Sequence, residues 1–339
     1  MAVSPWSAEP ARALELGEQL LSLAERSQDP QQLLWAHGLV GAARWLRAEL
    51  ALARKHLDKA LAHYTRGSQH PLNTLFGFHA GVMSLVWQAG TLWLMGLPDQ
   101  ARRHLQEALH EAQAGDDPVT LAYVSSAAGL YLSLVDRAAP TNRPPEETLD
   151  AMKQAGSAFE LLAEIFAGHE AIEKGSAEAS LQRIRQGISA LQGMGGAISH
   201  AGQLVLLAQG YAATGQTQAG LDTLDQALTW MDRTGVCMFE AEAHRLRGDL
   251  LLLNQPRQNE TIRAAEACFR TAICIARRSR LPWWELRATV SLCRLLQEQT
   301  PPGDLRHAEA HRMLAEIYGR FTEGFDTLDL SEARALLNA

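Results

Sequence analysis

The stretch ARRHLQEA, residues 101–108, carries the pattern that decides the fold of this chain. A small residue, Ala101, is followed four positions later by the large apolar Leu105, and three positions after that by a second small residue, Ala108. These residues share one helix face, where small side chains let a neighbouring helix approach and the large one fills the gap. The same pattern recurs at Ala53/Leu57/Ala60, Gly220/Leu224/Ala227 and Ala265/Phe269/Ala272. Because it returns about every forty residues, the pattern predicts a solenoid of stacked helical hairpins.

Apolar helical periodicity and turn signals divide the chain into paired helices. After an opening helix at 11–26, the expected pairs are 31–47 with 50–65, 75–95 with 98–113, 119–136 with 145–154, 157–173 with 177–191, 200–214 with 217–233, 239–253 with 260–278, and 282–298 with 305–318. The long interval between Ala108 and Gly187 predicts a degenerate copy at 146–156. The loop RAAPTNRPP predicts an irregular break near 137–146.

We therefore expect an all-α protein: one right-handed superhelical α-solenoid of tetratricopeptide-like helical hairpins that spans residues 1–339. A short C-terminal capping helix is expected at about 330–338, with Asp329 before it and Glu332 three residues on, as in a capping box.

The charge and the cysteine content limit which binding partners and which cellular compartment we expect. The formal net charge is −7, and Lys and Arg form no basic stripe, so we expect no nucleic-acid partner. The four cysteines form no C-x-x-C pair and are typical of reduced thiols in a cytoplasmic protein. The chain shows no secretory signal at its start. The uncharged run 80–98 is long enough to span a membrane, but its polar residues share one helix face, so we expect a buried solenoid helix and no membrane partner.

Several stretches resemble a known family more closely than generic repeats do. They are residues 13–41, AGTLWLMGLPDQARRHLQEALHEA at 89–112, EAEAHRLRGDLLLL at 240–253, WELRATVSLCRLL at 284–296 and IYGRFTEGFDTLDLSEARALL at 317–337. Together they resemble the C-terminal tetratricopeptide-repeat region of bacterial multidomain signalling proteins. In those proteins a class III adenylate or guanylate cyclase, or a winged-helix regulator, is fused to an AAA-type signal-transduction ATPase. The resemblance implies a sensing or scaffolding module without the domains that carry chemistry.

No catalytic or cofactor site is predicted. The chain contains no GxxxxGK[ST] phosphate loop. His307 and His311 lie four apart on one helix face, but no third ligand is near in sequence, so we expect a solvated face and no metal. Cys268 and Cys274 are expected to pack as small apolar side chains. The charged run HRLRGD, 244–249, is expected to be a solvated face, and the alternative is a charged lip of a groove.

An aromatic set is the candidate binding site. Aligning the first helices of the early pairs on Gly41, Ala89 and Gly129 places four aromatic residues on the face that lines the concave side of a solenoid. They are Trp35, Trp45, Trp93 and Tyr123. Such side chains offer a large apolar area with few rotatable bonds and a polar tip. The alternative is that they belong to the core, because a shift of one position turns them inward.

The favoured function is a non-enzymatic interaction or scaffolding module of a bacterial signalling system, binding a peptide or partner domain, including a cyclase or an ATPase, in its concave groove. The alternative is a small-molecule-sensing regulatory domain that oligomerises. A third hypothesis is an enzyme with a pocket in the irregular middle, 136–196, for which no catalytic set is evident. The start MAVSPWSAEP favours a free-standing protein over a fragment.

Overall fold

The computed structural model describes residues 10–67, 79–115, 117–135, 177–193, 200–253, 258–299 and 305–338, together with the isolated positions 161, 162, 164, 165, 168 and 172. These residues form helices and connecting turns, and none of them lies in a strand. The helices are α1 (Pro10–Ser27), α2 (Pro30–Leu46), α3 (Leu50–Ala62), α5 (Ala80–Leu94), α6 (Pro98–Ala114), α7 (Pro118–Val135), α10 (Ala177–Gly193), α11 (His200–Ala213), α12 (Thr217–Thr234), α13 (Glu240–Leu253), α14 (Asn259–Ser279), α15 (Pro282–Gln299), α16 (Leu305–Tyr318) and α17 (Leu328–Leu337).

The predicted fold class is confirmed: the described chain is an all-α array of tetratricopeptide-like hairpins. Consecutive helices pack as pairs, namely α2 with α3, α5 with α6, α11 with α12, α13 with α14, and α15 with α16. The degenerate copy at 146–156, the helix at 145–154 and the break near 137–146 lie outside the described residues. The extent of a single solenoid over 1–339 therefore stays a prediction.

Local signals explain where several helices begin and end. The Asp29 carboxylate accepts hydrogen bonds from the backbone N–H of Gln31 at 2.8 Å and of Gln32 at 3.2 Å, which caps α2. Pro98 and Pro282 stand at the first positions of α6 and α15, where a missing N–H costs nothing. The last helix begins at Leu328, two residues before the expected start, and its N-cap residue is Thr327, so the expectation that Asp329 precedes the helix as its cap was wrong. Asp329 lies in the first turn and pairs with the buried Arg287.

The large residue of the small-large-small pattern packs against a glycine on the first helix of the same pair. A methyl group on Gly41 of α2 would lie 2.6 Å from Leu57 Cγ, and one on Gly248 of α13 would lie 2.5 Å from Phe269 Cε1. Leu57 and Phe269 are fully buried. The large residue of each second helix thus occupies the space that glycine leaves open, which brings the two helices close together.

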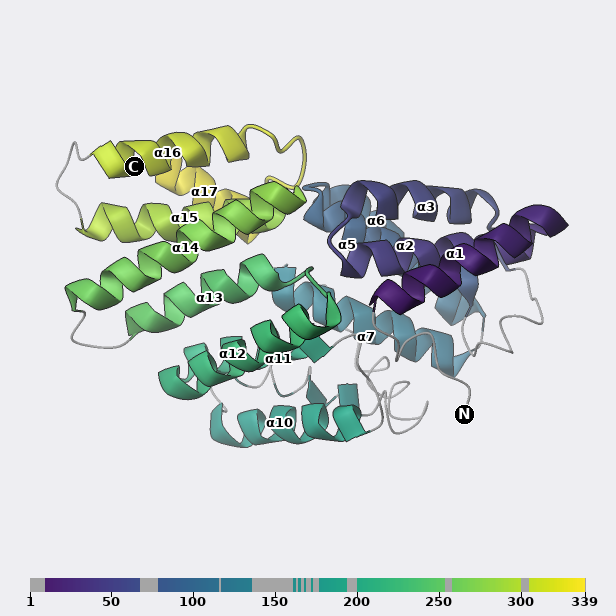
Figure 1. The fold of residues 1–339 in the computed structure, drawn as a ribbon, viewed down its shortest axis with the longest axis horizontal. Helices are drawn as coiled ribbons and strands as arrows, with labels where there is room; N and C mark the ends of the chain where they lie inside the picture. Colours follow the sequence, from purple (N-terminus) through teal and green to yellow (C-terminus); the bar gives the residue numbers. More distant parts are fainter. Residues whose placement is uncertain are drawn as a thin grey trace.

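The helices form two arms that contact each other. In Figure 1 the first arm, α1 to α3 with α5 and α6, lies on one side, and the second arm, α13 to α17, lies on the other, with α7 and α10 to α12 below them. The backbone N–H of Cys237 donates to the Leu46 carbonyl at 2.9 Å, and the Trp45 ring lies 6.1 Å from Phe239. A second contact joins Trp93 of α5 to Trp283 of α15, with ring centroids 5.4 Å apart. The inner helices therefore pack against the opposite arm.

Helix α5 shows the consequence of this closure. All of its residues are buried, as expected for an uncharged and largely apolar helix that lies inside a protein. Ser84 and Thr91 bond to the carbonyls of Ala80 and Trp87 on the preceding turn, and Gln88 donates to Asp58 of α3 at 2.6 Å. None of the described helices has the length and apolar character needed to cross a bilayer.

Candidate functional site at the junction of the arms

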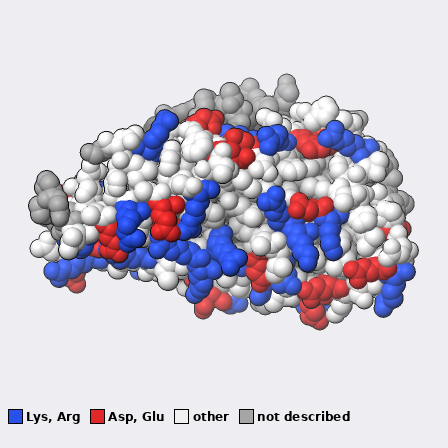
Figure 2. Space-filling view, turned by 90° about the horizontal axis from the view of Figure 1, so that it is seen from above, with Lys and Arg blue, Asp and Glu red and all other residues white. Residues whose placement is uncertain are grey.

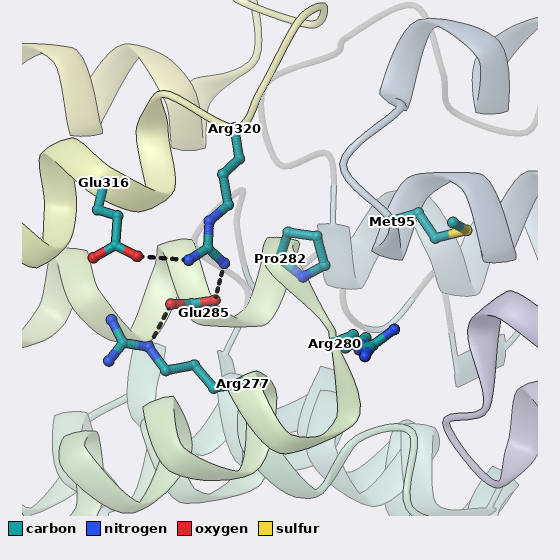
Figure 3. A pocket seen from close by; sticks show the side chains of 7 residues that line it. All are labelled: Met95, Arg277, Arg280, Pro282, Glu285, Glu316 and Arg320. Carbon is teal, nitrogen blue, oxygen red and sulfur yellow. Dashed lines mark hydrogen bonds and ion pairs between the residues drawn. The ribbon is translucent and has the colours of Figure 1, made fainter.

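A pocket of about 590 Å³ opens where the end of α5 meets the second arm (Figure 3). Its lining residues come from the residue after α5, the end of α14 and the residue after it, the start of α15, the last turn of α16 and the segment that follows α16. They are Met95, Arg277, Arg280, Pro282, Glu285, Glu316 and Arg320. This volume lies within the range of about 300–1,000 Å³ that small-molecule sites occupy. We call it the junction pocket.

Glu285 organises the polar wall of the junction pocket. Its carboxylate is 2% exposed and accepts from Arg277 Nε at 2.6 Å and from Arg320 Nη1 at 3.3 Å. Arg320 also donates to Glu316 at 2.8 Å. Because a buried carboxylate needs charged partners to offset its desolvation, Glu285 fixes the position of two guanidinium groups at the pocket wall.

Arg280 differs from the other two arginines. It follows α14 with φ 54°, in the left-handed region, and is exposed. Among the described residues it forms no ion pair, and Figure 3 shows it on the side of Met95, apart from Glu285 and Glu316. The pocket thus holds three guanidinium groups and two carboxylates, and the first turn of α15 begins in its wall at Pro282. An unmatched arginine beside a helix N-terminus favours an anionic ligand.

The predicted aromatic residues lie in the interior. Trp35, Trp45 and Trp93 are 1%, 3% and 4% exposed, and Tyr123 is half-buried against the same core. Burial raises the pKa of the Tyr123 phenol well above its ordinary value. Trp45 packs edge-on against Trp87 at 5.1 Å. In this arrangement the three tryptophans expose little surface to a partner. This is the alternative stated above, in which they belong to the core. Their role in binding stays a prediction.

The run HRLRGD was expected to be a solvated face, and for Arg245 this was wrong. Arg245 is buried and pairs with Glu242 through two bonds, at 2.7 and 2.8 Å, and with Asp249 at 2.5 Å. Burial acts to lower its pKa, but the two carboxylates more than offset this, and the pKa is raised. Arg287 pairs with Glu242 at 3.1 Å and with Asp329 at 2.8 Å. This buried network ties α13, α15 and α17 together, and helical periodicity contains no signal for it.

The remaining candidates carry no evident chemistry. The rings of His307 and His311 are 6.5 Å apart, and His311 lies 3.3 Å from the Leu337 carbonyl. Over the described parts of the chain, no three His, Cys, Asp or Glu side chains come together as metal ligands would. Cys268 is half-buried and Cys274 is exposed. Burial raises the pKa of Cys293 to about 12, which keeps its thiol protonated and unreactive.

Comparisons with known proteins show similarity at the level of the fold alone. No family model matches the sequence, and no curated protein is similar to it. A STAND-type signal transduction ATPase with a tetratricopeptide repeat sensor from Pyrococcus horikoshii is 13% identical with a TM-score of 0.47, covering 96% of this chain and 48% of that one. Human IFIT1 with m7Gppp-AAAA is 14% identical, TM-score 0.47, covering 96% and 75%, and a monomeric IFIT1 mutant with Gppp-AAAA is 15% identical, TM-score 0.48, covering 96% and 76%. The chain spans about half the length of the first of these.

The expectation that nucleic acid is not a partner is contradicted by this comparison. IFIT1, a helical-repeat protein of this fold class, is seen with the capped oligonucleotides Gppp-AAAA and m7Gppp-AAAA. Net charge describes the whole chain and by itself does not exclude a local site for a phosphate group. On the face shown in Figure 2, basic and acidic side chains are interspersed among uncharged ones.

Proposed function

We propose that this chain is a non-enzymatic regulatory module that binds a small anionic molecule, bearing a carboxylate or phosphate group, in the junction pocket. The observation that carries the proposal is Arg280, an exposed guanidinium without an ion-pair partner among the described residues, beside two arginines that Glu285 holds in place. Planar guanidinium groups match the geometry of carboxylate and phosphate oxygens. The sensing module implied by the sequence resemblance is consistent with this ligand class.

Isothermal titration calorimetry of the full chain with inorganic phosphate, citrate and ATP tests the proposal. We expect saturable binding of at least one probe, and about a tenfold loss of affinity in Arg280→Gln, the size of one charge-assisted contact. The matched control is Arg278→Gln. It removes a neighbouring exposed arginine that is not part of the pocket and has only a 3.9 Å contact with Glu240.

Two results would overturn the proposal. One is that no probe binds, or that Arg280→Gln binds as tightly as the unchanged chain. The other is that a 5′-phosphorylated tetranucleotide binds much more tightly than ATP and loses affinity as salt rises, which would indicate a nucleic-acid site.

A protein-interaction module is the second candidate, and one observation favours it. Residues 319–327 already dock on the beginning of α6, through the Glu323 side chain and the Gly324 backbone N–H, in the manner of a bound peptide. A partner segment from a signalling protein, a cyclase or ATPase included, would then bind such a surface. The cytoplasmic location and the oligomerisation expected from the sequence belong to this proposal. Pull-down with the chain from cell extract, before and after Glu323→Ala, which loosens the segment from Gln100 without removing a residue of the junction pocket, separates it from the first candidate, which needs no protein partner.

A further inference from the structure

The segment 319–327, which we call the strap, leaves the end of α16 and crosses to the first arm. Phe321 is 5% exposed, and its ring lies 5.7 Å from Trp283. On the other side, a methyl group on Gly96 would lie 3.0 Å from Phe321 Cε1. The aromatic ring therefore fills the space between α15 and the turn that joins α5 to α6.

Polar contacts hold the strap on the beginning of α6, directly after that turn. Glu323 accepts from the Gln100 backbone N–H at 3.0 Å and from Gln100 Nε2 at 3.1 Å. The Gly324 N–H donates to Asp99 at 3.2 Å. Arg102 lies 3.3 Å from Asp326. These bonds join residues more than two hundred positions apart in the sequence, so they form only when the arms meet.

Gly324 is required for this approach. Its φ is 74°, and a methyl group there would lie 2.1 Å from Pro98 Cγ. Any other residue would strain the backbone and also push the strap away from the first turn of α6.

The strap and the junction pocket share their walls. Arg320, which lines the pocket, directly precedes Phe321, and Met95, which lines the opposite side, directly precedes Gly96. The pocket is thus bounded by the residues next to the docked contact, one from each arm. With the strap undocked, Arg320, which belongs to it, is held at the pocket wall by Glu285 and Glu316 alone, and the wall opposite Met95 loosens.

We infer that docking of the strap and binding of an anion in the junction pocket are coupled, with Phe321, Glu323 and Gly324 as positioning residues for that site. The inference rests on the proposed function. A ligand that needs both walls binds the closed arrangement better than the open one and shifts the population toward it. Because this coupling is reciprocal, a change that undocks the strap lowers the affinity for the ligand by the same factor.

Gly324→Ala tests the coupling in the full chain, with ATP as the probe. We expect its ATP affinity to fall at least fivefold, although residue 324 does not line the pocket. In the unchanged chain, saturating ATP should slow amide hydrogen exchange of the peptide that covers 319–327 by a similar factor. The control is Gly215→Ala, whose φ of 71° carries the same backbone strain with no atom within 4 Å.

The outcomes separate the two proposals. If Gly324→Ala exchanges faster over 319–327 but binds ATP as tightly as the unchanged chain, the coupling is wrong and the pocket proposal stands. If no probe binds the unchanged chain, both are wrong. Should Gly324→Ala fail to fold by circular dichroism, Glu323→Ala replaces it, since it removes only the two hydrogen bonds to Gln100 at the surface. Loss of ATP affinity is again expected, and unchanged affinity refutes the coupling.

Discussion

Gly248→Ala is the sharpest test of how the repeat pattern builds this fold. The added methyl would lie 2.5, 2.8 and 2.9 Å from three atoms of the Phe269 ring, which is fully buried. A rigid ring cannot move one atom alone, so the whole side chain or the helix must shift, at a cost of about 1–3 kcal/mol. Alanine in a helix interior gains roughly 0.5–1 kcal/mol over glycine. We therefore expect a net loss of about 1–2 kcal/mol in the free energy of unfolding.

Urea unfolding followed by circular dichroism at 222 nm measures this loss. The matched control is Gly210→Ala, whose methyl would meet only the flexible ends of Ile172 and Leu181, at 3.0 and 3.1 Å. That variant should be near neutral or slightly stabilised. Phe269→Leu in the Gly248→Ala background should recover about 1 kcal/mol by relieving the contact. A gain in stability for Gly248→Ala, equal to that of the control, would refute the packing argument.

Three further predictions concern the interior. Burial, and then the charges of His56 and its neighbours, lower the pKa of His37 to about 4. Between pH 6.5 and 4 this imidazole is therefore protonated in the unfolded chain but not in the folded one. The contribution of His37 to stability should be fully present above pH 6.5 and be lost, by up to about 3 kcal/mol, as the pH falls toward 4. His37→Gln should reduce the slope of stability against pH in urea titrations at several pH values. Arg287→Met leaves the buried Glu242 without one of its partners, and should cost about 3–5 kcal/mol by thermal and urea unfolding. Trp45→Ala should cost about 3–5 kcal/mol in the same assay, because Trp45 is 3% exposed, and a change of less than 1 kcal/mol would place its ring at a surface after all.

The candidate site shows where reasoning from sequence stops. The sequence places the four aromatic residues on inner helices, but the choice between groove and core depends on what covers those helices. Trp45 and Trp93 are covered by Phe239 and Trp283, which lie far along the chain. The only local signal was the absence of charge from the run 80–98, which indicates burial on every side without naming the partner. The pocket residues carry no common motif.

What the sequence by itself determined is the hairpin. The spacing of small and large residues, the prolines at the starts of α6 and α15 and the Asp29 cap all act within a helix or between neighbours, so they are readable without coordinates. What only the tertiary structure decided is the meeting of the arms. Contacts such as Glu323 with Gln100 depend on the accumulated orientation of every helix pair between them, and no local pattern encodes that sum. The burial of Arg245 and Asp329 follows from the packing of α13, α15 and α17 within one arm, because a charge is stable inside only where its partner arrives.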